Sequence, residues 1–226
     1  MEAASKARLT ALRNKYSEAK TSSSRASLLS GHDLAPTNWS RRLVAFGGGG
    51  DGQLGSSALL DSSKGMTCLK TPCWVSLEAA EGAYDTNRTP KEVACGSQLT
   101  LAVMEDGKVF VWGNGYLGCH EKSKNSAGKR FSPRSKGITK TRIPRCIASL
   151  SNIKSVAVGC QDHCLALAKD GFVWSWGAGA GGKLGHGDLL DVEHPKQIEG
   201  LYNVSTISVG EMHSCALNHQ GVLYTW

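Results

Sequence analysis

The sequence has no long apolar run. Nowhere do eighteen apolar residues follow one another, which is the length that a membrane-spanning helix requires. The first residues, MEAASKARLTALRNKYSEAK, also lack the apolar core of a secretory signal. The eight cysteines are therefore expected to be reduced thiols, and we expect the protein in the cytoplasm or the nucleus.

Proline is scarce and glycine is abundant, with 6 Pro and 27 Gly among 226 residues. The loops at 47–52 and 177–182 fit the dinucleotide pattern GxGxxG, and Lys183 extends the second one toward a phosphate loop. Neither loop is followed by an amphipathic helix, whose N-terminal amides would hold a phosphate. Leu184 stands where a phosphate loop has Ser or Thr. We interpret both loops as structural turns and expect no bound nucleotide and no cofactor.

One spacing recurs in three segments, VACGSQLTLAVMEDGKVFVWGNG, VAVGCQDHCLALAKDGFVWSWGAG and ISVGEMHSCALNHQGVLYTW. Within each segment, a small residue is followed by a glycine and then by a tryptophan. In chain order, these glycine and tryptophan pairs are Gly107 with Trp112, Gly171 with Trp176, and Gly221 with Trp226. The glycine lies between two apolar runs rich in β-branched and aromatic residues. This pattern predicts a β-hairpin with the glycine in its turn.

The repeats resemble those of the regulator of chromosome condensation family. The segments GEMHSCALNHQGVLYTW, WGAGAGGKLGHGD and HPKQIEGL carry the resemblance, which extends over about residues 43–226. That family folds as a seven-bladed β-propeller, so the resemblance implies an all-β chain that forms a partial propeller of about three blades. No Trp-Asp dipeptide occurs, which disfavours a WD-type propeller. Because a full ring needs more repeats, we expect a truncated or partial member.

Residues 1–42 are expected to form a basic tail that precedes the propeller. Apolar residues at helical spacing predict a short helix in this tail, and TSSSRASLLSG predicts a flexible linker. We expect residues 43–226 to form the propeller repeats, with a basic insertion at 119–145.

The repeated residues are interpreted first as structural. The tryptophans are expected to anchor the blade cores, and His163 and His213, which share one repeat position, are expected to form structural hydrogen bonds. Cys95, Cys164 and Cys215 are interpreted as small core residues. The spacing of Cys160, His163 and Cys164 matches no zinc pairing, so no metal site is expected. No catalytic constellation stands out, and any enzymatic activity would be nucleotide exchange by the complete propeller.

The basic insertion holds nine cations and one acid in 27 residues. So many positive charges in a short segment repel one another, which favours an acidic partner that neutralises them. We therefore expect these nine side chains to be exposed on a loop that binds an acidic protein. They are Lys122, Lys124, Lys129, Arg130, Arg134, Lys136, Lys140, Arg142 and Arg145.

Three classes of function remain open. The first is a protein-interaction scaffold. The second is guanine-nucleotide exchange on a small GTPase, which the basic insertion or a blade-face acid such as Asp162 or Asp188 would contact. The third is binding of chromatin or nucleic acid through the basic tail and loop, with an affinity that falls steeply with salt. The resemblance implies the first two, because members of the family use projecting loops to bind small GTPases or acidic patches on histones.

Overall fold

The structure, a computed structural model, describes residues 43–55, 68–75, 77, 89–119 and 139–226. The chain divides into two units, residues 1–40 and 41–226, and every described residue belongs to the second. The predicted tail and residues 120–138 of the basic insertion lie outside the described residues. No helix in the part of the chain that the structure describes is long and apolar enough to span a membrane.

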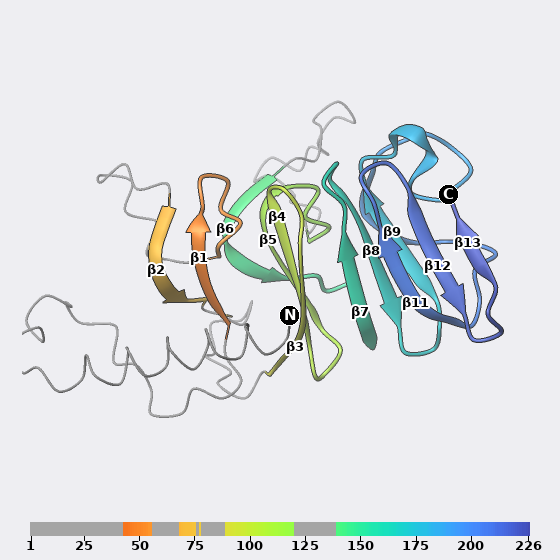
Figure 1. Cartoon of the computed structure of the whole chain (residues 1–226), viewed down its shortest axis with the longest axis horizontal. Helices are drawn as coiled ribbons and strands as arrows, with labels where there is room; N and C mark the ends of the chain where they lie inside the picture. The colour runs from red at the N-terminus through yellow and green to blue at the C-terminus, as the bar shows by residue number, and fades with distance from the viewer. Residues whose placement is uncertain (1–42, 56–67, 76, 78–88, 120–138) are drawn as a thin grey trace, which may run out of the picture. The chain divides into compact units, whose positions relative to one another are not determined.

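Within the described residues, thirteen β-strands form four antiparallel sheets (Figure 1). The first sheet pairs β1 (Val44–Gly48) with β2 (Cys68–Trp74). The second has the order β3 (Pro90–Cys95), β4 (Leu99–Met104), β5 (Val109–Gly115) and β6 (Thr139–Cys146). The third runs from β7 (Ile153–Val158) through β8 (His163–Ala168) and β9 (Val173–Gly177) to β10 (Val192–Gln197). The fourth contains β11 (Val204–Val209), β12 (Ser214–Asn218) and β13 (Leu223–Thr225).

The three predicted hairpins are confirmed as β4–β5, β8–β9 and β12–β13. Their turns contain Gly107, Gly171 and Gly221 at φ values of +80°, +85° and +83°. A left-handed backbone of this kind is strained for any residue with a Cβ atom, which explains the recurrence of glycine. The predicted all-β class and partial propeller are confirmed by these sheets.

The middle strands of the second and third sheets are buried on both faces. All six residues of β4 and all six of β8 are buried, because each sheet packs against a neighbour on either side. Leu101 and Val111 of the second sheet share a core with Val156 and Ala166 of the third. Burial on both faces explains why LTLAVM and HCLALA lack the alternation of a half-exposed strand.

The sheets have two distinct ends. We call one the glycine-loop end, which consists of the loops at 49–55, 116–119 and 178–191 and the turns at 96–98, 159–162 and 210–213. At the opposite end, the first two hairpin turns pack on the link into the next sheet. Gly107 meets Asn152, and Gly171 meets Asn203, at positions where a Cβ atom would lie 2.9 and 3.0 Å from the asparagine Cα.

Candidate functional site

Each tryptophan of the repeat is bound by the glycine loop of the preceding sheet. The indole Nε1 atoms donate to backbone carbonyls, from Trp112 to Gln53 at 2.8 Å, from Trp176 to Tyr116 at 3.1 Å and from Trp226 to Lys183 at 3.0 Å. The indoles lie against the glycines that close these loops, Gly55, Gly118 and Gly185, so closely that a Cβ atom would lie within 3.0 Å of each Nε1.

Hydroxyl groups from the next sheet use the same carbonyls. Thr100 donates to Gln53 O at 2.9 Å, and Ser214 donates to Lys183 O at 2.8 Å. The glycine loops at 47–55 and 177–185 are therefore contacts between neighbouring sheets. Glycine is required there because an indole occupies the space of a side chain, which supports the interpretation of these loops as structural turns.

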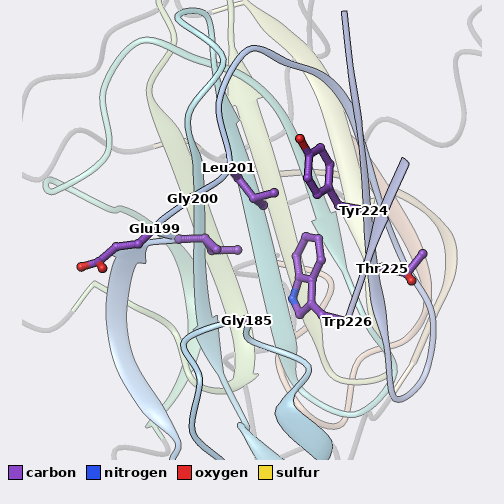
Figure 2. Close-up of a pocket in the computed structure, with 8 residues that line it drawn as sticks. Gly185, Glu199, Gly200, Leu201, Tyr224, Thr225 and Trp226 are labelled. Carbon is purple, nitrogen blue, oxygen red and sulfur yellow. The ribbon is translucent and has the colours of Figure 1, made fainter. Parts of the chain in front are cut away.

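The third tryptophan contact borders a pocket of about 300 Å³ (Figure 2). Tyr224 and Trp226 face Leu201 across it. Trp226 is half-buried, whereas Trp112 and Trp176 are buried. At Trp176 the corresponding space is filled by Pro195 of β10, whose Cδ atom lies 3.2 Å from the position of a Cβ on Gly118. The pocket therefore lies where a fourth strand packs in the third sheet.

Lys183, which completes the apparent phosphate-loop motif, is a buried cation. Its side chain is 2% exposed, and Nζ lies 3.9 Å from the thioether sulfur of Met212. Its charge acts on two neighbours, Asp162 and His163. Burial raises the pKa of Asp162, and Lys183 partly opposes that rise. The ammonium is enclosed by the third and fourth sheets, so it is not presented to a phosphate.

His163 does not act as the predicted hydrogen bonder. It is fully buried, and neither ring nitrogen has a hydrogen-bond partner among the described residues. Its ring packs on Gly159, where a Cβ atom would lie 2.4 Å from Nδ1. Burial and the charge of Lys183 lower the pKa of His163 to about 4. The role of the residue is therefore packing, which Leu99 fulfils at the same repeat position.

Replacing His163 by leucine is expected to reduce the pH dependence of stability. The pKa is about 6.5 in an unfolded chain and about 4 in the folded protein. The unfolded state therefore binds more protons in this window, and the wild type loses stability as the pH falls from 6.5 through 4. The loss is on the order of 2–3 kcal/mol. Urea unfolding at pH 7 and pH 4.5 measures it.

The matched control for this variant is His213→Leu, because His213 holds the equivalent position but is exposed. It controls for the removal of an imidazole ring at this repeat position. An unchanged pH slope in His163→Leu would show that His163 titrates normally in the folded protein.

The structure describes three of the nine predicted partner-binding cations, and the expectation of a loop is wrong for them. Lys140, Arg142 and Arg145 belong to strand β6, which pairs with β5. Lys140 forms an ion pair with Asp51 at 3.7 Å and donates to the carbonyl of Gly50. Strand β6 pairs along β5, whose residues are mostly buried, so this end of the insertion is part of the sheet. The other six cations lie outside the described residues.

The core role predicted for three cysteines holds for one of them. Cys164 is fully buried, and burial raises the pKa of its thiol. Cys215 is half-buried and Cys95 is exposed, because it lies on the outward face of the first strand of its sheet. No group of three or more His, Cys, Asp or Glu residues in the described segments could hold a metal ion.

The sequence analysis missed the group around Asp191. This carboxylate accepts from the backbone N–H of Gly179 at 3.0 Å and from the hydroxyl of Tyr116 at 2.5 Å. Burial and Asp191 raise the pKa of Tyr116. Asp191 therefore links the glycine loops of two sheets and holds the loop that carries Leu189 and Leu190. The sequence did contain a signal for this group, because the apolar pair Leu189-Leu190 stands between Asp188 and Asp191.

The stacked antiparallel sheets, joined by one repeated tryptophan contact, define a protein of the β-propeller repeat class. Residues 91–119 and 170–217 match the regulator of chromosome condensation (RCC1) repeat. The chain therefore contains repeats of this family.

Curated relatives share part of their length with the chain. It is 37% identical to the human E3 ubiquitin-protein ligase HERC2 over 140 residues, which is 60% of this chain and 3% of HERC2. It is 34% identical to the ultraviolet-B receptor UVR8 of Arabidopsis thaliana over 139 residues, which is 60% of this chain and 29% of UVR8. The chain thus spans less than a third of either relative.

Two solved structures share the fold. Prp20p from Saccharomyces cerevisiae matches with a TM-score of 0.59 and 24% identity, covering 77% of this chain and 39% of Prp20p. Human WBSCR16 matches with a TM-score of 0.59 and 21% identity, covering 80% of this chain and 41% of WBSCR16. These matches support the propeller repeat fold.

Proposed function

We propose that this chain is a propeller-type interaction scaffold whose basic insertion, residues 119–145, binds an acidic surface of a protein partner. The observation that carries the proposal is the charge of this segment, nine cations against one acid. A lone buried cation costs several kcal/mol, so the unpaired members of such a segment belong in water or against an acidic surface.

The described end of the insertion supports this proposal. Lys140 and Arg145 are exposed on β6, although Lys140 already has Asp51 as a partner. The insertion is anchored to the second sheet through β6. Binding by charge requires no catalytic group among the repeat residues. We place this function in the cytoplasm or the nucleus.

Nucleotide exchange on a small GTPase is the second candidate. The solved structure of Prp20p is described together with its binding properties to Gsp1p and histones. These are properties of Prp20p, and their transfer to this chain is a hypothesis. Direct binding of chromatin or nucleic acid through the basic segments is a third candidate, for which no described residue gives specific support.

Reversing three charges of the insertion is expected to weaken capture of an acidic partner. The variant Lys129→Glu/Arg130→Glu/Arg134→Glu should bind immobilised poly-L-glutamate, an acidic polypeptide, at least about tenfold more weakly at low salt. Most of the change should be in the association rate, and added salt should reduce the difference from the wild type. Surface plasmon resonance at two ionic strengths measures both effects.

The control variant is Lys108→Glu/Lys169→Glu/Lys196→Glu, which makes the same change in net charge at exposed positions outside the insertion. Equal weakening in both variants would contradict a specific role of the insertion, as would a large fall in melting temperature of the insertion variant with binding unchanged. Faster release of labelled GDP from a small GTPase would instead favour the exchange candidate.

A further inference from the structure

Three large apolar side chains are exposed together at the glycine-loop end. Leu189, Leu190 and Met212 are 67%, 69% and 46% exposed, and we call them the Leu-Met patch. Gly181 and Gly182 lie between Met212 and Leu189. A Cβ atom at Gly181 would lie 3.4 Å from Met212 Cε, and one at Gly182 would lie 3.8 Å from Leu189 Cδ2. Neither glycine places a side chain between Met212 and Leu189, and exposed apolar side chains gathered on neighbouring loops mark an interaction site.

The segments that carry the patch are rich in carboxylates. The segments that form it, residues 159–162, 178–193 and 210–213, contain five acids, Asp162, Asp188, Asp191, Glu193 and Glu211. All except Asp162 are exposed. Their one Lys or Arg residue is Lys183, which is buried. The exposed charge of these segments is therefore acidic, although the chain as a whole has a net charge of +7, and we call the four exposed carboxylates the rim.

The loop that carries the patch is held in place before any partner binds. Asp188 Oδ1 accepts from the backbone N–H of Leu190 at 3.0 Å, and Asp191 is bonded to Gly179 and Tyr116. On the other side, Glu211 accepts from Gln161 Nε2 at 3.1 Å. A surface that is already ordered loses less conformational entropy when it binds.

We propose that the Leu-Met patch binds a basic peptide segment of a partner protein, with an apolar side chain set between Lys or Arg residues. The apolar anchor covers Leu189, Leu190 and Met212, while the cations face Asp188, Glu193 and Glu211. Charge complementarity selects this occupant. The carboxylates of the rim would repel an acidic segment, and a neutral apolar segment would leave them without a cationic partner. This site goes beyond the acidic partner proposed for the insertion, since it recognises the opposite charge through other residues.

The test uses the full chain and a fluorescein-labelled peptide, KRKLLKRK, in fluorescence anisotropy. We expect binding to weaken about tenfold or more in Leu189→Ser/Leu190→Ser, and in Glu193→Gln/Glu211→Gln, which removes charge without changing shape. Leu223→Ser and Glu105→Gln/Glu199→Gln change exposed residues elsewhere and should leave binding unchanged. Melting curves by circular dichroism should be the same for all variants.

Several results would overturn the proposal. A peptide with serines in place of its two leucines, KRKSSKRK, should bind about tenfold more weakly. Equal binding of the two peptides would mean that the face attracts charge without a docking site, and absence of binding by either would exclude the site. If Lys129→Glu/Arg130→Glu/Arg134→Glu raised the affinity for KRKLLKRK, the basic insertion of the same chain would be the occupant, and a partner in trans would be excluded.

Discussion

Trp176→Ala is expected to lower the free energy of unfolding by about 3–5 kcal/mol. The indole is fully buried, packs on Gly118 and donates to the carbonyl of Tyr116 at 3.1 Å. Truncation would leave a cavity between two sheets and a buried carbonyl without its donor, and the two costs add. Urea unfolding followed by far-ultraviolet circular dichroism measures the change.

Trp226→Ala is the matched control, because Trp226 makes the same hydrogen bond but lines an open pocket and is only half-buried. This variant is expected to lose about 1–2 kcal/mol of the free energy of unfolding, since less apolar surface returns to water. Trp176→Phe separates the hydrogen bond from the packing. If Trp176→Ala cost no more than Trp226→Ala, the tryptophan contact between sheets would not be the main source of their association.

The variant Gly177→Ala is expected to cost about 2–5 kcal/mol. Gly177 has a φ of +112°, and a Cβ atom there would lie 2.1 Å from the carbonyl oxygen of Asp162 and 2.9 Å from the Cα of His163. Both neighbours are backbone, so a rotamer change cannot relieve the overlap. The Asp162 carbonyl is also held by the N–H of Ala178 at 2.9 Å. Thermal unfolding by calorimetry should show the melting temperature falling by several degrees or more.

Gly221→Ala distinguishes steric overlap from backbone strain alone. Its φ is +83°, and nothing lies within 4 Å of its Cβ position. This control is expected to cost about 1–2 kcal/mol, which is the strain of a left-handed backbone for alanine. Equal costs for the two variants would show that the sheets relax around Gly177 and that its closeness to Asp162 is unimportant.

The hairpins and the family were accessible from the sequence because their signals are local. A glycine between two apolar strands needs only its neighbours to specify a turn, as at Gly107 and Gly171. The same local glycine patterns at 47–52 and 177–182 resembled a nucleotide site. The absence of a following helix was enough to favour the structural interpretation, but the indole against each closing glycine was not visible in the sequence.

The site depended on contacts between residues distant in the chain. Leu189 and Met212 come to lie on either side of Gly181 and Gly182 because the third sheet packs against the fourth. His163 is enclosed by packing and has no hydrogen-bond partner among the residues that the structure describes. Likewise, Lys140 was assigned to a loop because charge alone does not reveal a strand that pairs with a buried neighbour.

The sequence by itself determined the repeat unit, its hairpin turns and the location of the basic charge, because turn conformation and net charge depend on residue type and short spacing. Only the tertiary structure decided which carbonyl each tryptophan binds, that Lys183 is enclosed and that the side chains of the Leu-Met patch are exposed. Those properties arise where neighbouring sheets exclude water from some polar groups and leave others exposed. That selection depends on packing between segments some 30 to 75 residues apart in the chain, as for the bonds of Ser214 with Lys183 and of Tyr116 with Asp191.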